Sequence, residues 1–298
     1  MKRVQALADD YDALRPRMVR VAYAILGSRA DAEDVVADCW PRLVEADARE
    51  PIRDLAGWLT VAVARAATDV LRSARVRRET YVGPWLPEPY VAAAGEPGDP
   101  ADRVTLDETV SYALAVVLES LSPAERTAWV LHDVFGMGFA EVAAVVGRTP
   151  AAVRQLASRA RTHLAAQSPR YQVDRTAHDA VLGRFLAAAA GGDLDALIAT
   201  LDPDVVLTAD GGGVVSSARR PVHGADRVAR FIAGLVAKYD GQVEVDLVEA
   251  NGAPAIAMRA DGELILLVVL TVVGDRATRV DMLRAPAKLA AVDVLRRG

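Results

Sequence analysis

Cysteine is almost absent from this sequence, because Cys39 is the only one among 298 residues. A single thiol cannot form an internal disulfide, nor the zinc site that several thiolates build together. Cys39 lies in an apolar helical stretch, and free cysteine is one of the most commonly buried residues, so we expect it in a core. We predict no metal and no cofactor for the chain.

Aromatic residues are scarce, at 5%, while alanine and valine are abundant. Small aliphatic side chains must therefore fill the cores, which suits closely packed helices. Long hydrophobic runs are also missing: the longest, Leu264–Val273, is far shorter than a membrane span and is rich in β-formers. Met1–Asp10 lacks the apolar stretch of a signal peptide. We expect a cytoplasmic protein with no membrane contact.

The chain lacks an excess of positive charge, and its formal net charge is −5. Proteins that bind free duplex DNA are usually basic, because phosphate contacts dominate their affinity. Either nucleic acid is not the partner, or local basic patches reach DNA as part of a larger machine. The arginines are unevenly distributed, which keeps the second interpretation open.

Two regions of helical periodicity, about 10–80 and 103–166, are separated by a stretch rich in proline and glycine. After Ser168-Pro169 the period changes to mixed helices and strands. The expected helices are Tyr11–Leu26, Asp31–Val44, Leu55–Arg78, Arg103–Leu118, Asp174–Ala190, Asp193–Leu201 and Ala225–Lys238. The expected strands are Val205–Ala209, Val243–Val248, Ala255–Arg259, Leu264–Val273 and Thr278–Leu283.

The segment Leu121–Leu164 has the pattern of a helix-turn-helix. Ser122, Pro123 and Glu125 predict a capped helix start, and glycines then separate it from a short helix over Phe139–Val146. A longer helix follows Thr149-Pro150. One side of it is apolar (Val153, Leu156, Ala157, Ala160 and Leu164), and the other carries side chains suited to bases and phosphates (Arg154, Gln155, Ser158, Arg159, Arg161 and Thr162). A solvated amphipathic helix is the alternative.

A second basic helix is predicted over Trp58–Arg78. Leu59, Val63, Ala66, Ala67, Val70 and Ala74 form its apolar side, and Arg65, Thr68, Asp69, Arg72 and Arg75 its polar side. From Arg65 to Glu79 there are five arginines and two acids, which suits contact with a nucleic-acid backbone. Here too a merely solvated helix face is the alternative.

These segments resemble the sigma-70 family of transcription initiation factors, of the extracytoplasmic-function type. "GSRADAEDVVADCW" (Gly27–Trp40) is similar to the polymerase-binding helix of sigma domain 2, and "GWLTVAVARAATDVLRSARVRRE" (Gly57–Glu79) to its helix for the minus-ten element. Leu121–Arg161 resembles domain 4, which contacts the minus-thirty-five element. The resemblance also accounts for the acidic charge, because core polymerase delivers such factors to DNA.

The linker "YVGPWLPEP" (Tyr81–Pro89) resembles that of a subgroup with a fused C-terminal SnoaL-like domain. The implied fold is multidomain: two all-α sigma domains, the second a helix-turn-helix, then an α+β cone of the ketosteroid-isomerase type. The expected boundaries are 8–80 for domain 2, 81–102 for the linker, 103–167 for domain 4 and 172–298 for the SnoaL-like domain.

The resemblance implies partners and site residues. Core RNA polymerase is expected to bind Asp31, Glu33, Asp34 and Asp38. Promoter DNA is expected at Arg65, Thr68, Arg72, Arg75, Arg77, Arg78, Arg154, Gln155, Ser158, Arg159 and Arg161. Regulatory interdomain contacts are expected at Trp85, Leu86, Pro87, Asp210, Gly211, Gly212, Gly213 and Lys288, with an unknown small ligand or protein as a further partner of the C-terminal domain.

Three departures from the family pattern bear on these expectations. Pro41 lies inside the polymerase-binding helix, where proline removes one backbone hydrogen bond, so we expect a kink near Ala37. The subgroup's Asp-Gly-Gly-Gly-Lys motif ends here in Val214. Its Asn-Pro-Asp-Lys-Leu motif reads Ala285-Pro286-Ala287-Lys288-Leu289.

Two other functions remain as alternatives, a ligand-sensing DNA-binding regulator that works without polymerase and a SnoaL-type enzyme. An enzyme of that fold needs an acid or histidine base in its cone, and the candidates are Asp210, His223 and Asp281. Each has an ordinary structural explanation: Asp210 starts a turn, and His223 precedes a helix. Asp281 lies on the side of a strand that we expect to face solvent. We therefore predict no catalytic residue and no enzymatic activity.

Overall fold

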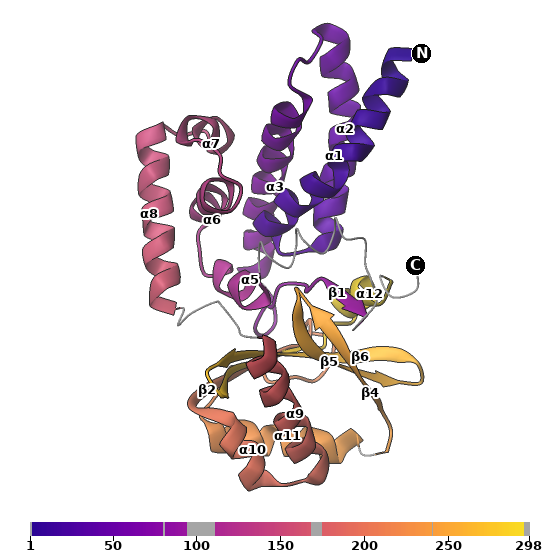
Figure 1. Cartoon of the computed structure of the whole chain (residues 1–298), viewed down its shortest axis with the longest axis vertical. Helices are drawn as coiled ribbons and strands as arrows, with labels where there is room; N and C mark the ends of the chain where they lie inside the picture. The colour runs from indigo at the N-terminus through magenta and orange to yellow at the C-terminus, as the bar shows by residue number, and fades with distance from the viewer. Residues whose placement is uncertain (1, 80, 94–110, 168–174, 240, 295–298) are drawn as a thin grey trace. The chain divides into compact units, whose positions relative to one another are not determined.

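The computed structural model describes residues 2–79, 81–93, 111–167, 175–239 and 241–294 (Figure 1). They form two compact units, one from Met1–Glu79 and Ala115–Ser168, the other from Thr80–Leu114 and Pro169–Gly298. The linker therefore groups with the C-terminal part of the chain. Each unit is described separately.

Three long helices begin the first unit: α1 (Lys2–Leu26), α2 (Arg29–Arg49) and α3 (Leu55–Glu79). Gly27 ends α1 in the left-handed region, with φ at 71°, and Ser28 caps α2 by accepting a hydrogen bond from the Asp31 amide. The helices pack on one another through small aliphatic side chains. Cys39 is fully buried among them, as predicted.

The first helix begins at Lys2, nine residues before the predicted start. The prediction followed the apolar stripe, which starts at Tyr11, and ignored the polar turns before it. An ion pair holds those turns in place. Arg3 donates from Nε and from Nη2 to the two carboxylate oxygens of the largely buried Asp47 of α2, at 2.7 and 2.8 Å. α2 continues through Pro41 to Arg49, beyond its predicted end.

Helices α6 (Pro123–Trp129), α7 (Phe139–Val146) and α8 (Pro150–Gln167) complete the first unit, together with the part of α5 (Tyr112–Leu118) that begins at Ala115. The predicted capping box is present, with Ser122 and Glu125 bonding each other's backbone amides. A π-helical turn, η1 (Val130–Val134), replaces the end of the predicted α-helix. The predicted start at Arg103 lies outside the described residues.

The second unit holds a sheet and several helices. Three helices precede or interrupt the strands, namely α9 (Arg175–Gly191), α10 (Leu194–Thr200) and α11 (Ala225–Tyr239), and a short helix follows the last strand. The strands are β1 (Val91–Ala93), β2 (Leu201–Asp210), β3 (Val222–His223), β4 (Glu244–Ala250), β5 (Ala253–Ala260), β6 (Glu263–Val273) and β7 (Arg276–Leu283). Their order in the sheet is β1-β4-β5-β6-β7-β2-β3, and only β2 and β7 pair in parallel.

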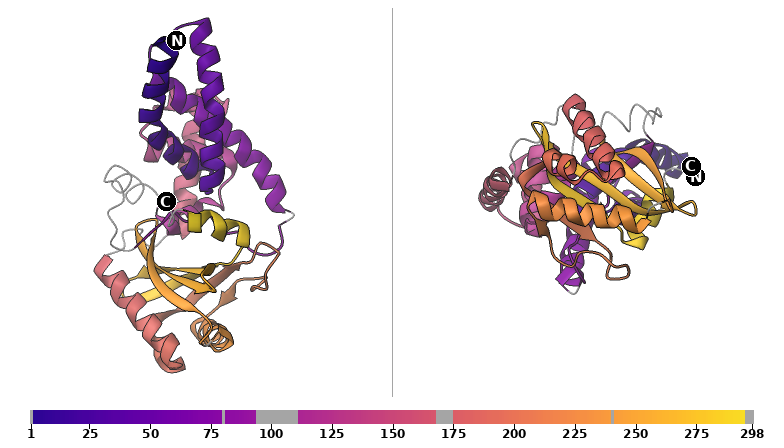
Figure 2. Two further views of the ribbon diagram at one scale, coloured as in Figure 1. Left: turned by 90° about the vertical axis from the view of Figure 1, so that its right-hand side faces the viewer. Right: turned by 90° about the horizontal axis from the view of Figure 1, so that it is seen from below.

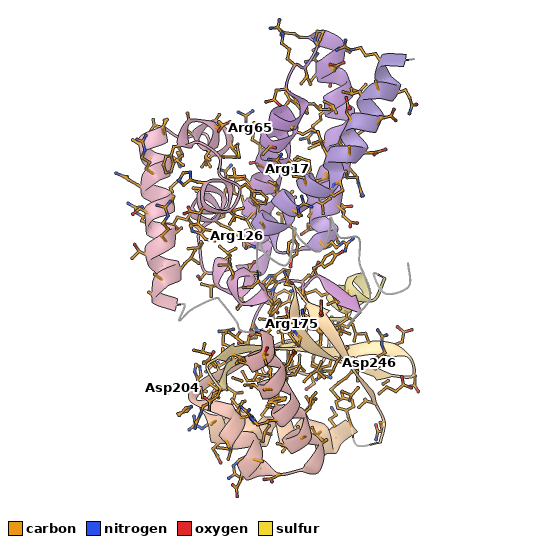
Figure 3. The ribbon with its side chains drawn as sticks, in the orientation of Figure 1. Arg17, Arg65, Arg126, Arg175, Asp204 and Asp246 are labelled. Atoms are coloured by element: carbon orange, nitrogen blue, oxygen red, sulfur yellow. The ribbon has the colours of Figure 1, made fainter. Side chains whose placement is uncertain are left out.

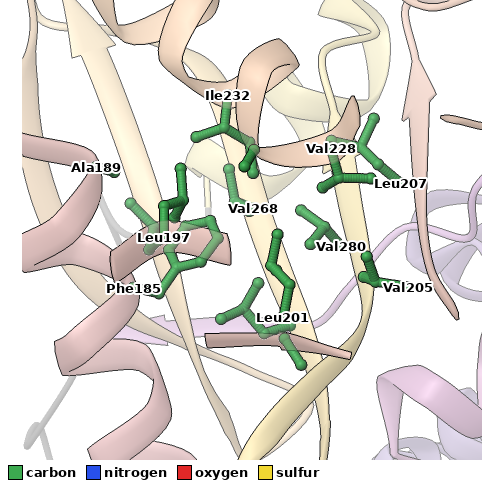
Figure 4. Close-up of a cluster of buried hydrophobic side chains, with 14 of the residues drawn as sticks. Phe185, Ala189, Leu197, Leu201, Val205, Leu207, Val228, Ile232, Val268 and Val280 are labelled. Atoms are coloured by element: carbon green, nitrogen blue, oxygen red, sulfur yellow. The ribbon is translucent and has the colours of Figure 1, made fainter. Parts of the chain in front are cut away.

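One face of this sheet carries α9, α10 and α11, and the main hydrophobic core lies between them. Phe185, Leu197, Leu207, Ile232, Val268 and Val280 meet there (Figure 4). The short helix α12 (Pro286–Val294) lies on the opposite face, where Leu289 and Val292 are buried (Figures 1 and 2). All five predicted strands are present, with boundaries shifted by a few residues.

The Arg3–Asp47 pair makes a testable prediction about pH. The hydrogen bonds from Arg3, and then that from the Ile52 amide, lower the pKa of Asp47 from 3.8 to about 2. A lowered pKa contributes stability that is present above the ordinary pKa and is lost as the pH falls through the folded-state pKa. We expect Asp47→Asn to lower the free energy of unfolding at neutral pH, with the deficit shrinking between pH 3.8 and about 2.

Urea unfolding followed by circular dichroism over that pH range measures the deficit. Asp34→Asn, at an exposed position of the same helix, is the control and should show no such convergence with the wild type. A deficit for Asp47→Asn that is equally large at every pH would contradict the assignment.

Candidate functional site

The helix-turn-helix exposes the polar side of α8 as the sequence predicts. Val153, Ala157, Ala160 and Leu164 are buried, and Leu156 is half-buried. On the other side, Arg154, Gln155, Ser158, Arg159, Arg161 and Thr162 are all exposed. The Thr149 hydroxyl accepts a hydrogen bond from the Ala152 amide and so fixes the start of the helix.

Two arginines of this exposed face are held by neighbours from the preceding turns. Arg161 donates to the Asp133 carboxylate at 2.6 Å, and the Arg154 guanidinium lies 5.2 Å from the centre of the Phe139 ring. The ion pair neutralises part of the charge of Arg161. Arg154, Gln155 and Ser158 therefore form the better-placed part of the face for contacts with base edges.

The predicted exposed side of α3 is only partly correct. Arg65 and Arg72 are exposed, whereas Thr68 is 1% exposed, so its predicted position on the solvent side is wrong. The Thr68 hydroxyl donates to the Ala64 carbonyl at 2.6 Å and shares a hydrogen bond of 3.1 Å with the Thr127 hydroxyl of α6. The prediction gave this helix a single buried side, whereas α3 packs on two sides. The side chains of Arg75, Arg77 and Arg78 lie outside the described residues.

Arg65 also contacts the helix-turn-helix (Figure 3). Its guanidinium donates to the Ala144 carbonyl of α7 from Nε at 3.2 Å and from Nη2 at 2.8 Å. Arg72 pairs with Asp69 one turn away, at 3.0 Å. In this conformation α6 and α7 thus cover part of the basic face of α3. Full access of a nucleic acid to that face requires these helices to separate.

A buried arginine also links α6 to α1. Arg126, 1% exposed, forms an ion pair of 2.5 Å with Glu119 and donates to the Ala24 carbonyl at 3.3 Å (Figure 3). Breaking a buried pair of this kind is costly, because the remaining charge is then left uncompensated. Arg126 therefore stabilises the same closed arrangement as Thr68 and Thr127.

The acidic residues expected to bind polymerase lie along α2. Asp34 and Asp38 are exposed, and Asp31 is half-buried in the first turn. Glu33 is paired with Arg29 at 2.7 Å. Asp34 and Asp38 are therefore the carboxylates most available to a basic partner.

The linker is attached to the C-terminal unit through Asp210, whose carboxylate is fully buried at the end of β2. It accepts hydrogen bonds from the Tyr81 hydroxyl at 2.5 Å and from the Leu86 amide at 2.9 Å. Lys288 of α12 pairs with the same carboxylate at 2.7 Å. We call this cluster, together with Trp85, the linker anchor.

Lys288 also contacts the linker directly. Its ammonium donates to the Leu86 carbonyl at 2.5 Å and lies 3.1 Å from the centre of the Trp85 ring, which meets the Tyr81 ring edge-on. Trp85, Leu86 and Lys288 were all among the predicted regulatory residues. Pro87, which was also predicted, follows Leu86 in the chain and is buried.

Two of the three glycines after Asp210 lie against the linker. Gly212 has φ at 68°, and a Cβ there would lie 3.1 Å from Ala285 and 3.7 Å from the Tyr81 hydroxyl. At Gly213, with φ at 71°, a Cβ would lie 3.1 Å from Val82. Any side chain would be strained by the positive φ and would press on its neighbour. At Gly211 a Cβ would lie 2.5 Å from the Val215 carbonyl. Val214, where the family has lysine, is 78% exposed.

A second attachment follows the first along the chain. Tyr90 and Asn251 are joined by two hydrogen bonds, from the Tyr90 amide to Asn251 Oδ1 at 2.9 Å and from the Asn251 amide to the Tyr90 carbonyl at 2.8 Å. Val91–Ala93 then pairs with β4 as an antiparallel edge strand. The linker is thus part of the C-terminal sheet.

The three candidate catalytic residues do not meet in a cavity. Side chains alternate along a strand, and Ala209 and Met282 belong to the helix-covered core, so Asp210 and Asp281 lie on the other face of the sheet. Asp281 is 1% exposed, and so its expected solvent position is wrong; burial raises its pKa although Arg279 donates to it at 2.8 Å. His223 is exposed.

No cluster of histidine, cysteine and acidic residues suited to a metal ion occurs among the described residues. Within that same part of the chain, no helix is both long enough and apolar enough to span a membrane.

Comparison with known proteins gives matches over most of the chain. The model for sigma-70 region 2 matches residues 11–77, that for sigma-70 region 4 matches 111–164, and that for a SnoaL-like domain matches 182–288. The "ECF RNA polymerase sigma factor SigJ" of Mycobacterium tuberculosis is 48% identical over 231 residues, which are 77% of this chain and 73% of that protein. The chain belongs to the extracytoplasmic-function (ECF) sigma factors.

Two further likenesses extend over nearly the whole ECF sigma factor. The "Probable ECF RNA polymerase sigma factor SigI" of M. tuberculosis is 34% identical over 286 residues, 93% of this chain and 92% of that protein. The crystal structure of M. tuberculosis SigJ superposes with a TM-score of 0.76 at 38% identity, covering 95% of this chain and 98% of the other. The predicted fold class, sigma regions followed by an α+β SnoaL-like domain, is confirmed.

Membership of the family settles what kind of protein this is. Sigma factors bind core RNA polymerase and promoter DNA, and they are not enzymes, as the sequence predicts. Region 2 covers most of α1–α3, and region 4 covers α5–α8. The linker residues 81–93 fall outside all three matches, although β1 is a strand of the C-terminal sheet.

Sequence reasoning missed several residues of these sites. Tyr81 and Tyr90 belong to the linker that was singled out, but their partners Asp210 and Asn251 are more than a hundred residues away. The sequence does not single out Asn251. Thr127 and Arg126 gave no signal, because a polar residue inside a short helix is ordinary unless its buried partner is known.

The Thr68–Thr127 hydrogen bond predicts the result of a double-mutant cycle. Thr68→Val leaves the buried Thr127 hydroxyl without its partner, and we expect a loss of about 1–3 kcal/mol in the free energy of unfolding. Replacing both threonines by valine removes both polar groups, so the double variant should recover most of that loss. Urea unfolding of the full chain measures all four proteins. Losses that simply add would contradict the pairing.

Proposed function

We propose that this sigma factor directs core RNA polymerase to its promoters through three surfaces. On α2, Asp31, Glu33, Asp34 and Asp38 bind the core enzyme. The basic face of α3, with Arg65, Arg72, Arg75, Arg77 and Arg78, binds the minus-ten region once α6 and α7 have moved away. On α8, Arg154, Gln155, Ser158, Arg159 and Arg161 enter the major groove. The proposed activity is cytoplasmic, because core polymerase and promoter DNA are in the cytoplasm.

We further propose that the C-terminal domain restrains the sigma regions by holding their linker. The single observation that carries this proposal is the buried Asp210 carboxylate, which bonds Tyr81, Leu86 and Lys288. The regulatory roles of Pro87 and of Gly211, Gly212 and Gly213 follow from the same cluster, because the first is buried beside it and the glycines let the loop approach the linker.

The direction of the effect follows from the length of the connector between α3 and α5. Anchoring takes residues 81–93 out of that connector and leaves only the residues after 93 to span any separation of the two regions. A shorter tether allows fewer separated arrangements, and so favours the closed one. Release of the anchor therefore increases the population that can bind a promoter.

Run-off transcription with core polymerase tests the restraint. Asp210→Asn removes the charge that holds Lys288, and Tyr81→Phe removes only one hydrogen bond from the linker, so both should raise transcription, the first more than the second. Asp204→Asn, at an exposed position of the same strand, is the matched control (Figure 3). Unchanged or lowered transcription with Tyr81→Phe, which leaves the three other donors to Asp210 in place, would contradict an inhibitory anchor.

A second experiment separates base contacts from phosphate contacts on α8. Gln155→Ala should cost about 1–3 kcal/mol at one promoter position and relax the base preference there. Arg159→Gln should weaken initiation by a similar factor at every promoter sequence. Transcription from a library of single-base promoter variants measures both. A uniform loss with Gln155→Ala would remove it from the base-contacting set.

A further inference from the structure

A cavity in the C-terminal unit is not used by the linker anchor. It is open to solvent on one side and has a volume of about 410 Å³, within the size range of small-molecule sites, between the end of the sheet, α11 and the loop 211–218. Ala209 and Met282 of the sheet and Phe231 and Leu235 of α11 supply its apolar lining. The remaining lining residues are Ser216, Ser217, Ala218, Arg230, Gly234, Lys238 and Arg284.

The charged residues that line this cavity are all basic, in a chain with a net charge of −5. Arg230 is partly neutralised by Asp226 at 2.9 Å, one turn earlier on α11. Arg284 is held by neutral groups: its Nη1 donates to the Ser216 carbonyl at 2.5 Å and its Nη2 to the Tyr239 hydroxyl at 2.8 Å. These two bonds orient the guanidinium beside the cavity and leave other N–H donors of the group for a ligand.

An apolar lining with an oriented guanidinium at its edge fits one class of molecule. We propose that this cavity binds a small amphipathic carboxylate, with its apolar body against Phe231, Leu235 and Met282 and its carboxylate on Arg284 and Lys238. A neutral apolar molecule would leave the cations unpaired, and a cation would be repelled. Hydrogen bonds to a charged group contribute more than neutral ones, so the carboxylate gives selectivity as well as affinity.

The cavity and the linker anchor share their supporting elements. Ala209 lines the cavity, and the next residue, Asp210, holds the linker on the other face of the sheet. The Arg284 amide donates to the Asp210 carbonyl at 2.7 Å. The loop from Gly211 to Ala218 begins at the anchor, where the Gly212 amide donates to the Asp210 carboxylate at 3.0 Å, and ends as a wall of the cavity.

A ligand that fits the cavity in this conformation therefore favours the anchored linker. This coupling rests on the restraint proposed above, whereas the binding site itself does not. Coupling between two sites is reciprocal: the ligand favours the docked linker by the same factor by which docking favours the ligand. A weaker anchor must therefore lower the affinity for the ligand, by that factor at most.

Calorimetric titration of the full chain with three ten-carbon probes tests the ligand class. Sodium decanoate, below its micelle-forming concentration, should bind about tenfold more tightly than 1-decanol, the factor expected for one hydrogen bond to a charged group. Decyltrimethylammonium should not bind. Equal affinity for decanoate and decanol would overturn the assignment of a carboxylate, and absence of decanoate binding would overturn the site.

A blocking variant locates the binding. A Cβ added at Gly234, in the helix that lines the cavity, would have no atom within 4 Å, so Gly234→Trp can fill the cavity without a clash at the backbone. Gly183 is an exposed glycine of α9 with the same free space, and Gly183→Trp is the matched control. Decanoate should bind the control like the wild type and should fail to bind Gly234→Trp. Full affinity in Gly234→Trp would place decanoate elsewhere.

The reciprocal experiment tests the coupling. Tyr81→Phe should lower the affinity for decanoate, by at most the factor by which decanoate protects the anchor of the wild type, while Asp204→Asn should leave the affinity unchanged. Unaltered affinity in Tyr81→Phe would disprove the coupling even if the cavity binds decanoate. Failure of the restraint itself is seen separately, because transcription by Tyr81→Phe without decanoate would then not rise above that of the wild type.

Discussion

A fully buried carboxylate is stable only when it is paired and hydrogen-bonded, and in this protein the linker supplies two of the groups that Asp210 needs. Without the Tyr81 hydroxyl and the Leu86 amide, Asp210 would keep Lys288 and the Gly212 amide but would lose half of its donors. The linker in turn depends on the C-terminal domain, since the Lys288 ammonium donates to the Leu86 carbonyl. The buried charges of the C-terminal domain are therefore satisfied by a segment that lies, in sequence, between the two sigma regions.

Under the proposed restraint, the connector between α3 and α5 has two lengths, one with the linker docked and one with it released. Where the linker is docked, β1 extends the C-terminal sheet and the segment before it fills the anchor. The closed contacts of Thr68, Arg65 and Arg126 hold α3, α6, α7 and α1 together within the first unit. Under the proposed restraint, the C-terminal domain needs no new surface on DNA or on polymerase, because it would act on how readily α3 and α8 can separate.

The sequence predicts a helix or strand best where the element's own pattern of apolar residues determines which side is buried. The faces of α8 follow from a single apolar stripe, and the five strands from their alternation and turns. The predictions fail where a segment distant in sequence determines burial or pairing. Thr68 is buried because α6 covers it, and Asp281 is buried because its face of the sheet is covered. Val91–Ala93 is a strand because it pairs with the edge of β4. Asp210 and Lys288 were singled out by resemblance to a family, and only the structure joins them into one ion pair.

Hydrogen exchange at the Leu86 amide, measured in the full chain, tests most directly whether the linker is held. That amide is buried and donates to Asp210, whereas Gly83, three residues earlier, is exposed. The account predicts that Leu86 exchanges far more slowly than Gly83 and that Asp210→Asn removes most of this protection. Exchange of Leu86 at the rate of an unstructured peptide in the wild-type chain would contradict the claim that the C-terminal domain holds the linker.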